Sequence, residues 1–282
     1  MTIKLLVCCH KEGESGDGLV TTVAGGAALE KGKLLCDYRD DDGENISSLN
    51  PVYNELTVLY WAWKNYAKLG SPDYLGLMHY RRYFRFEEGE DALLRTSCSK
   101  GLFREKSLAT EERVRSLLSR GDFLCPRPMR RRSVYRQYAF TQTREDLDLA
   151  ITVLKELRSE YQNAAERYLN GKDCYFFNMF VFPKEIFFRY CEYLFPILAE
   201  YVARRKGEGR LYISECLTGV FLTELMREGL VPIHLPVLYR ENGEDGRFAR
   251  FRRGWKEGKT IKTKFLAVAR LFAWRRRERR RI

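Results

Sequence analysis

The chain has 282 residues, of which 45% are hydrophobic and 13% aromatic, enough for one large core or two small ones and too many for a disordered protein. Its net charge of +12 belongs to the C-terminal end: residues 247–282 contain 15 Lys and Arg against 2 Asp and Glu, or +13, which leaves 35 against 36, or −1, for residues 1–246. No segment has the pattern of a secretory leader, and no apolar run reaches the roughly 18–20 residues of a spanning helix. We therefore expect a protein that stays in the cytoplasm.

Eight cysteines lie in mostly apolar segments, without a C-x-x-C pair or the Cys and His spacing of a zinc site. This pattern predicts reduced, packed thiols. A metal or redox role is the alternative.

The first predicted strand covers residues 3–9 and ends in His10 and Lys11, ahead of a loop that contains glycine. Many nucleotide-binding α/β domains open in this way. The small residues 23–28 either let the backbone approach a ligand closely or form a plain turn. The acidic residues of the 40–48 stretch either contact a metal or sugar hydroxyls or belong to a solvated loop.

Apolar and aromatic residues recur at helical spacing over residues 52–65, which predicts an amphipathic helix whose aromatic side chains face the core. Glu55, Thr57 and Lys64 are polar exceptions within it. We keep these three as candidate site residues.

The rest of the chain is organised around residues 74–79, a mostly apolar run that ends abruptly in Tyr80, Arg81 and Arg82. This pattern predicts a buried parallel strand that presents cations at its carboxyl end, which is where open α/β sheets bind ligands. Two guanidinium groups beside the imidazole of His79 suit a diphosphate or another oxyanion. The alternative is that the arginines pair with surface carboxylates and that His79 is a hydrogen-bonded core residue.

Further helices are predicted over residues 107–119, 143–157, 160–169 and 183–205 and from residue 212, and further strands over 122–126, 175–182 and 230–238. Residues 127–136 carry five arginines and are expected to form a loop that attracts anions or is only solvated. Asn178 is the single polar residue of an apolar strand and must find hydrogen-bond partners. Glu215 falls in the first turn of its helix, where the positive helix end favours a carboxylate.

Several of these segments together resemble a bacterial family first catalogued as a domain of unknown function. The resemblance is carried by residues 45–47, Asn54-Glu-Leu-Thr-Val-Leu-Tyr-Trp-Ala-Trp-Lys-Asn65, Tyr74-Leu-Gly-Leu-Met-His-Tyr-Arg-Arg-Tyr-Phe84, residues 177–180 and residues 213–215. Members of this family lie in gene loci for capsular polysaccharide and lipopolysaccharide O-antigen synthesis and act as glycosyltransferases. The similarity covers roughly residues 3–240.

The resemblance implies a GT-A-type, Rossmann-like single domain with a mixed, mainly parallel central sheet flanked by helices. This nucleotide-sugar-binding domain is expected over residues 1–246. Related transferases end a strand in Asp-x-Asp, which grips a divalent cation against the donor diphosphate. Here His79, Tyr80 and Arg81 occupy that position, so the need for a metal is uncertain and arginines are expected to neutralise the diphosphate directly.

The implied reaction moves a sugar from a nucleotide-sugar donor to a lipid-linked glycan, with inversion. A UDP-sugar is favoured as the donor, with UDP-galactofuranose as a first guess. Transfer with inversion needs groups that neutralise the negative charge on the leaving diphosphate, and a carboxylate that takes the proton of the acceptor hydroxyl. Arg81 and Arg82 are assigned the first role, with His79 as orienter, and Glu215 the second; Glu215 is alternatively only a helix-end charge.

The other implied site residues contact the donor. His10 and Lys11 are expected near the nucleotide. The four remaining candidates are expected to contact hydroxyl groups of the sugar. The alternative for each of them is a role in stabilising the core: Glu55, Thr57, Lys64 and Asn178.

The basic C-terminal segment, residues 247–282, is predicted to hold an amphipathic helix over residues 262–282. Its apolar residues form a patch over residues 265–274 that is flanked by Lys262, Lys264 and the basic run of residues 275–281, and such a helix suits the interface of an anionic membrane. We expect the protein on the inner face of the cell membrane, where a polyprenyl-diphosphate-linked acceptor lies. Nucleic-acid binding is the alternative for the tail, and a non-catalytic anion-binding module of a polysaccharide or nucleic-acid assembly is the alternative for the whole chain.

Overall fold

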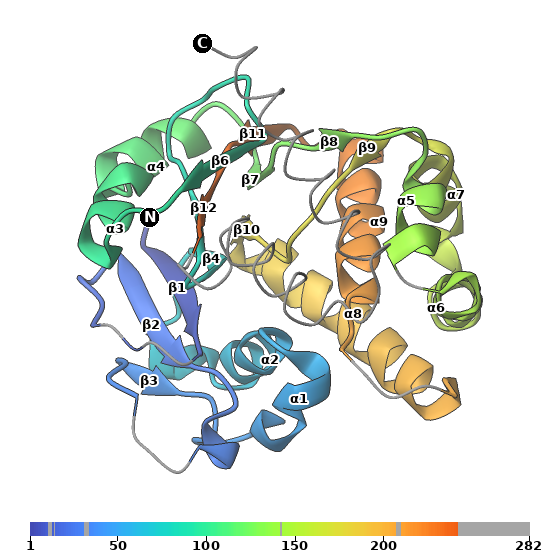
Figure 1. Ribbon diagram of the computed structural model, residues 1–282, viewed down its shortest axis with the longest axis horizontal. Helices are drawn as coiled ribbons and strands as arrows, with labels where there is room; N and C mark the ends of the chain where they lie inside the picture. Colours follow the sequence, from blue (N-terminus) through green and yellow to red (C-terminus); the bar gives the residue numbers. More distant parts are fainter. Residues whose placement is uncertain (11–12, 14, 31–33, 142, 207–209, 242–282) are drawn as a thin grey trace, which may run out of the picture.

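The computed structural model describes residues 1–10, 13, 15–30, 34–141, 143–206 and 210–241, which form one α/β domain (Figure 1). Seven strands make the main path of the sheet: β1 (Ile3–Cys9), β2 (Val20–Ala24), β3 (Tyr38–Arg39), β4 (Tyr74–His79), β7 (Phe123–Pro126), β10 (Phe180–Pro183) and β11 (Pro232–Leu235). Their order is β11-β7-β10-β4-β1-β2-β3. Three more strands extend the sheet through β4: β5 (Arg82–Phe84), β12 (Val237–Arg240) and β6 (Leu93–Thr96). A separate two-stranded ribbon pairs β8 (Met129–Arg130) with β9 (Asp173–Cys174).

The sheet is mixed but mainly parallel. β1 pairs in parallel with β2 and β4, and the pairs β2–β3, β7–β11 and β6–β12 are also parallel. β10 lies between β4 and β7 and runs antiparallel to both. β4 and β7 therefore run in the same direction, and their carboxyl ends lie along one edge of the sheet.

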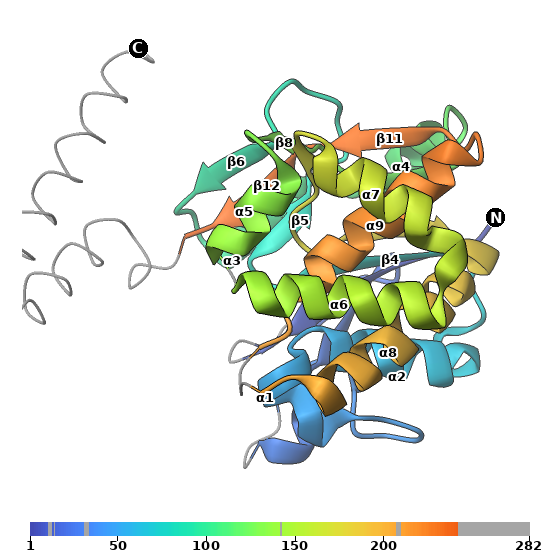
Figure 2. The ribbon, with the colours of Figure 1, turned by 90° about the vertical axis from the view of Figure 1, so that its right-hand side faces the viewer.

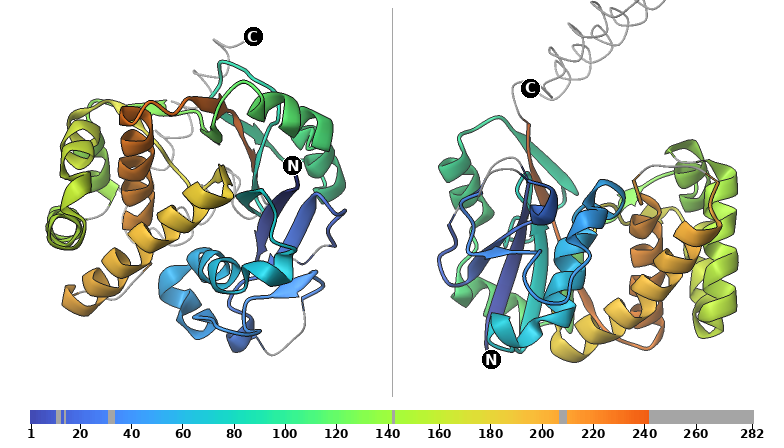
Figure 3. Two further views of the ribbon diagram at one scale, coloured as in Figure 1. Left: turned by 180° about the vertical axis from the view of Figure 1, so that it is seen from behind. Right: turned by 90° about the horizontal axis from the view of Figure 1, so that it is seen from below.

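Helices cover both faces of the sheet (Figure 3). Helices α3 (Lys100–Ser107) and α4 (Glu111–Leu118) pack on one face. On the other side lie α2 (Leu56–Lys64), α8 (Lys184–Arg204) and α9 (Ile213–Arg227). Beyond them, α6 (Arg144–Leu157) packs on α8, α7 (Gln162–Asn170) packs on α9, and α5 (Val134–Thr141) contacts both α6 and α7. One-turn helices lie at α1 (Asn50–Tyr53), Ala27–Leu29, Ser47–Leu49, Tyr66–Leu69 and Ser159–Tyr161.

Successive side chains of a strand point to opposite faces of the sheet, which explains why the protein has one hydrophobic cluster on each face. In β1, Leu6 and Cys8 join the cluster under α2 and α8, whereas Leu5 and Val7 join the cluster under α3 and α4. In β10, Phe180 and Phe182 face the first cluster, and both are fully buried. Each such side chain contributes about 1.5–3 kcal/mol on burial.

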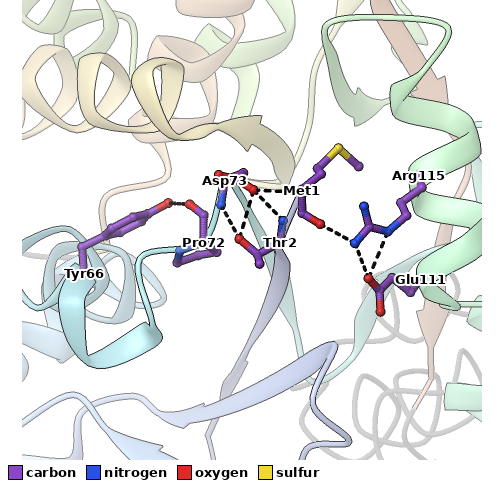
Figure 4. Close-up of polar contacts among 7 residues, drawn as sticks. All are labelled: Met1, Thr2, Tyr66, Pro72, Asp73, Glu111 and Arg115. Carbon is purple, nitrogen blue, oxygen red and sulfur yellow. Dashed lines mark hydrogen bonds and ion pairs between the residues drawn. The ribbon is translucent and has the colours of Figure 1, made fainter.

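A polar clamp aligns β1 with β4 at the edge opposite to their carboxyl ends (Figure 4). The Thr2 amide donates to Asp73 Oδ2 at 2.6 Å, and the Asp73 amide donates to Thr2 Oγ1 at 3.0 Å. The hydrogen bonds from Thr2 lower the pKa of the Asp73 carboxyl. Beside the clamp, Arg115 donates to the Met1 carbonyl and pairs with Glu111. The resulting register pairs Ile3 with Tyr74 and Cys8 with His79, so the two strands end side by side.

Most predicted elements are confirmed, and the differences have local causes. The helix expected over residues 52–65 is interrupted, because Asn54 adopts φ 50° and ψ −129°, which ends α1 before α2 begins. The strand expected over residues 175–182 begins only at Phe180, since Phe177 has φ 70° and is not extended. The strand expected over residues 230–238 is divided into β11 and β12 at Pro236, which has no N–H to donate.

Two other expectations are wrong. The helix predicted over residues 107–119 begins only at Glu111. The helix α3 and the strand β6, which precede it, were not predicted, because their sequences have no clear hydrophobic periodicity. Residues 127–136, predicted as a loop, contain β8 and the beginning of α5.

All eight cysteines are free thiols, as predicted. Within the described residues, no helix is long and apolar enough to span a membrane. The tail predicted over residues 247–282, with its helix at 262–282, lies outside the described residues.

Candidate active site

A pocket of about 490 Å³ opens where β1 and β4 end, between these strands and the beginning of α9. Seven of the ten candidate residues from the sequence line it: His10, Glu55, His79, Arg81, Arg82, Asn178 and Glu215. They come from segments up to about 200 residues apart in the chain. His10, His79 and the two arginines meet where the parallel strands β1 and β4 end, as the strand pattern predicted.

The two arginines lie in the tight connection from β4 to β5. His79 pairs with Arg82 across this antiparallel connection, and the Arg240 amide donates to the Arg81 carbonyl at 2.9 Å. The backbone of the turn is therefore held by β12 as well as by β4. The backbone positions from which the Arg81 and Arg82 side chains extend are therefore fixed.

Aromatic rings support the Arg82 side chain. Its guanidinium lies 4.8 Å from the centre of the Phe177 ring and 5.5 Å from that of Tyr239, within the range of cation–π attraction. Its Nε is buried and has no hydrogen-bond partner among the described residues. A buried N–H without an acceptor is costly, so the side chain is suited to receive an oxyanion.

The imidazole of His79 is neutral at physiological pH. Burial lowers its pKa well below the usual value, and the positive charges of Arg82 and Arg81 lower it further. Its Nδ1 accepts a hydrogen bond from the Arg81 amide at 3.3 Å. His79 therefore orients the arginine turn and adds no charge of its own.

Glu215 occupies the first turn of α9 and faces this cationic turn across the pocket. Burial raises the pKa of its carboxyl to about 7, and the negative charge of Glu55 contributes. Arg82 and a hydrogen bond from the Phe177 backbone act in the opposite direction. A carboxyl with a pKa near 7 can exchange a proton at physiological pH, as a general base must.

Phe177 is the strained residue of the site. It holds φ 70°, which costs a non-glycine residue of order 1–3 kcal/mol. In this conformation its ring lies under Arg82 while its backbone hydrogen-bonds Glu215. One residue thus couples the cationic and the acidic sides of the pocket.

Asn178 finds the partners that its burial requires. Its Nδ2 donates to Glu55 Oε1 at 2.8 Å and to Ser214 Oγ at 3.0 Å, and its Oδ1 accepts from Thr218 Oγ1 at 3.1 Å. Thr218 in turn bonds the Tyr190 hydroxyl at 2.6 Å. This network ties Glu55, at the beginning of α2, to the first turns of α9.

Two candidate residues lie away from the pocket. The Thr57 side chain is buried and bonds the Asn54 carbonyl and the Asn50 side chain, so it supports a pocket-lining residue. Lys64 lies at the far end of α2, over the Trp63 ring at 4.0 Å and 3.4 Å from Glu44. Lys11 lies outside the described residues.

Sequence reasoning did not name Arg210, Tyr212 or Ser214 as site residues, and it left residues 23–28 open between close approach of the backbone to a ligand and a plain turn. Arg210, Tyr212 and Ser214 line the pocket ahead of Glu215, and Tyr212 is 46% exposed. Gly26 also lines it and holds φ 72°, where an added Cβ would lie 2.7 Å from the Asn50 side chain. The turn at Gly25 and Gly26, between β2 and the one-turn helix Ala27–Leu29, therefore brings backbone to the pocket wall.

The described residues contain no group of three or more His, Cys, Asp or Glu side chains placed to hold a metal ion. Three acids from the described part of the chain line the pocket, Glu30, Glu55 and Glu215. Glu55 is bonded to Asn178, and the charge of Arg82 acts on Glu215. At the end of β4 the pocket is lined by His79, Tyr80 and Arg81. This donor set fits an anion better than a divalent cation.

The family model described as "Domain of unknown function (DUF4422)" matches residues 4–228. The chain belongs to this family. The family resemblance inferred from the sequence motifs is therefore confirmed, and the match includes every residue that lines the pocket. No curated protein matches the chain significantly.

A solved structure, that of the bifunctional glycosyltransferase WbbM without ligand, is similar to the chain with a TM-score of 0.76 and 27% sequence identity. The similarity covers 86% of this chain and 46% of the WbbM chain. The chain thus spans about half the length of that protein. The fold class predicted from the sequence, a mixed and mainly parallel sheet with flanking helices in one domain, is confirmed.

Proposed function

We propose that this DUF4422 domain is a glycosyltransferase that moves a sugar from a nucleotide-sugar donor to a glycan acceptor. The observation that carries the proposal is the pocket itself, in which a paired-arginine turn faces a carboxyl with a pKa of about 7. The similarity to the bifunctional glycosyltransferase WbbM supports the same reaction class.

In the proposed reaction the donor diphosphate lies against Arg81 and Arg82. The bond between the anomeric carbon and the diphosphate oxygen breaks, and its electron pair leaves with the diphosphate. Guanidinium groups placed in advance neutralise this charge without reorganisation, an effect typically worth about 10²–10³ in rate for one donor. Direct neutralisation by arginine replaces the role that a divalent cation has in enzymes with a dicarboxylate.

Glu215 acts as the base for inversion. The acceptor hydroxyl oxygen attacks the anomeric carbon from the side opposite to the diphosphate, and its proton passes to the Glu215 carboxylate. The Phe177 backbone and the nearby Arg82 hold the carboxylate. Glu55, Asn178 and His10 are assigned to the donor, because all three line the same pocket.

The acceptor is proposed to be a lipid-linked glycan of capsule or O-antigen synthesis, at the cytoplasmic face of the membrane. The basic composition of residues 262–282 supports this location. Flotation of the full chain with anionic vesicles tests it, with a chain that lacks residues 262–282 for comparison. The proposed role of the tail requires weaker binding after the deletion, and equal binding contradicts it.

The decisive experiment measures nucleoside diphosphate release from a panel of nucleotide sugars, beginning with UDP-galactofuranose, in the presence of candidate glycan lipids. Acceptor-dependent release that persists in EDTA is expected. Glu215→Gln should abolish release while donor binding, measured by calorimetry, stays within about two-fold. Binding without release from any donor would instead identify an anion-binding module without catalytic activity, and EDTA sensitivity would overturn direct neutralisation by arginine.

A further inference from the structure

The proposed reaction leaves one basic surface unused. It follows β7 and consists of Arg130, Arg132 and Arg136 with the ring of Phe140, and we call these four residues the arginine surface. All four side chains are exposed, Phe140 by 87%. A large aromatic side chain with that exposure is unusual beside three cations.

Several basic side chains elsewhere on the surface have carboxylate partners. Arg115 pairs with Glu111, Arg189 with Glu228, and Arg204 with Glu156 and Glu200. Within the described part of the chain, no carboxylate forms an ion pair with a residue of the arginine surface. The charge of this surface is therefore not cancelled locally.

Two carboxylates beside this segment do not change this balance. Asp173 faces Arg130 across the β8–β9 ladder, and Asp148 accepts a hydrogen bond from the Tyr135 hydroxyl at 3.0 Å. Arg131, which is also exposed, lies 5.5 Å from the Phe176 ring. The exposed arginines of this segment thus outnumber the acids that face them.

Helix α5 presents two members of the arginine surface, Arg136 and Phe140, outward. Its other face is buried, with Val134 at 0% and Tyr138 at 2% exposure, and the Tyr138 hydroxyl bonds the Tyr175 carbonyl at 3.0 Å. Arg136 and Phe140 are four residues apart, so they share the outer face of the helix. The anchored inner face makes the outer face a fixed platform.

The arginine surface lies on the same side of the molecule as the pocket. β7 and β4 run in the same direction, so the segment after β7 emerges at the edge where the pocket opens. In Figure 2 the arrowheads of β11 and β6 point toward the side on which α5 lies. β12 also ends there, because it is parallel to β6.

The chain beyond β12 strengthens this orientation. Residues 242–282 continue from that edge and contain 15 Lys and Arg against 4 Asp and Glu, with apolar residues between them. Two basic, partly apolar segments therefore start from one side of the molecule. This is the composition of a surface that meets anionic lipid headgroups.

We propose that the arginine surface docks the domain on an anionic lipid membrane and turns the pocket toward the headgroups. The three arginines contact lipid phosphates, and the Phe140 ring enters the boundary between headgroups and acyl chains. A membrane is favoured over nucleic acid because a lone exposed ring on the rim of the patch gains nothing from a phosphate backbone, whereas it is buried in the lipid interface.

The test is cosedimentation of the full-length protein with vesicles of phosphatidylglycerol and phosphatidylcholine, compared with phosphatidylcholine alone. The variant Arg132→Glu with Arg136→Glu is expected to bind anionic vesicles at least about 25-fold more weakly, since each basic residue near the surface contributes about five-fold. A matched control changes the same charge at the opposite edge of the sheet. In this control, Arg120→Glu with Lys184→Glu, Arg120 lies just before β7 and Lys184 directly follows β10. The control variant should bind anionic vesicles with an affinity within about two-fold of that of the parent.

Hydrogen exchange provides a second readout in the intact chain. Amides of α5 should gain protection on anionic vesicles, and those of α8 should not. Equal binding by both double variants, or no change at α5, overturns the proposal and leaves the tail as the membrane contact. A variant that loses affinity for single-stranded RNA but not for vesicles would overturn it in favour of nucleic acid. These assays contain no sugar donor, so their outcome is independent of the proposed glycosyl transfer.

Discussion

Glu215→Gln should make the protein more stable while it removes the proposed base. The pKa of Glu215 is raised from 4.5 to about 7, mainly by burial. At about 1.4 kcal/mol per pH unit, this difference of about 2.5 pH units corresponds to about 3 kcal/mol, which solvent screening of the partly exposed group reduces to about 2 kcal/mol. Glutamine keeps the size of the side chain and carries no charge to desolvate.

The sign of the pH dependence follows from proton linkage. Between pH 4.5 and about 7, the folded state holds a proton on Glu215 that the unfolded state has already released, so stability falls as the pH rises through this window. Below the window both states are protonated and the charge costs nothing. The stabilisation by glutamine should therefore be close to zero at pH 4.5 and reach about 2 kcal/mol at pH 8.

The measurement is urea unfolding of the parent and the variant at both pH values, combined with the transfer assay. Glu112→Gln is a matched control, because Glu112 also lies in the first turn of a helix but is exposed. It should leave the free energy of unfolding within about 0.5 kcal/mol of the parent. A Glu215→Gln variant that is no more stable than the parent at pH 8, or equally stabilised at both pH values, would refute the argument.

Three further predictions concern neighbouring residues. Glu55→Gln should move the lower midpoint of the pH–rate profile below 7, because it removes a charge that raises the pKa of Glu215; an unchanged midpoint argues against Glu215 as the base. Arg82→Lys should lower kcat by about 10-fold or more although the charge is kept, since lysine lacks the planar fork and the stacking on Phe177; equal turnover would make Arg82 a simple point charge. Asn178→Ala should cost about 1–3 kcal/mol in chemical denaturation by leaving Glu55 and Thr218 without their partner, and a loss under 0.5 kcal/mol would show that water replaces it.

The central part of the fold follows from the sequence. Uninterrupted apolar runs such as residues 74–79 are readable as interior strands, and the abrupt change to Arg81 and Arg82 marks a carboxyl end. Because parallel strands end at one edge, His10 and the arginines are expected to meet there, and they do. Glu215 was also recognisable, since a carboxylate in a first helical turn has a physical reason to lie there.

The remaining features depend on tertiary contacts that no local pattern encodes. Asn54 and Phe177 adopt positive φ without being glycine, so neither the break before Glu55 nor the late beginning of β10 has a signal in the sequence. Lys64 and Thr57 share a helix with the pocket residue Glu55, but their positions turn them to the surface and the core, respectively. Helical periodicity identifies such faces only when the beginning of the helix is known.

The antiparallel strand β10 restricts how the chain length can vary. It enters the sheet from the pocket edge, and only five residues separate β9 from it. One residue more or fewer there would slip the strand and exchange the faces of Phe180 and Val181. Homologous chains can therefore lengthen their outer loops freely, while residues 175–179 are expected to keep a constant length.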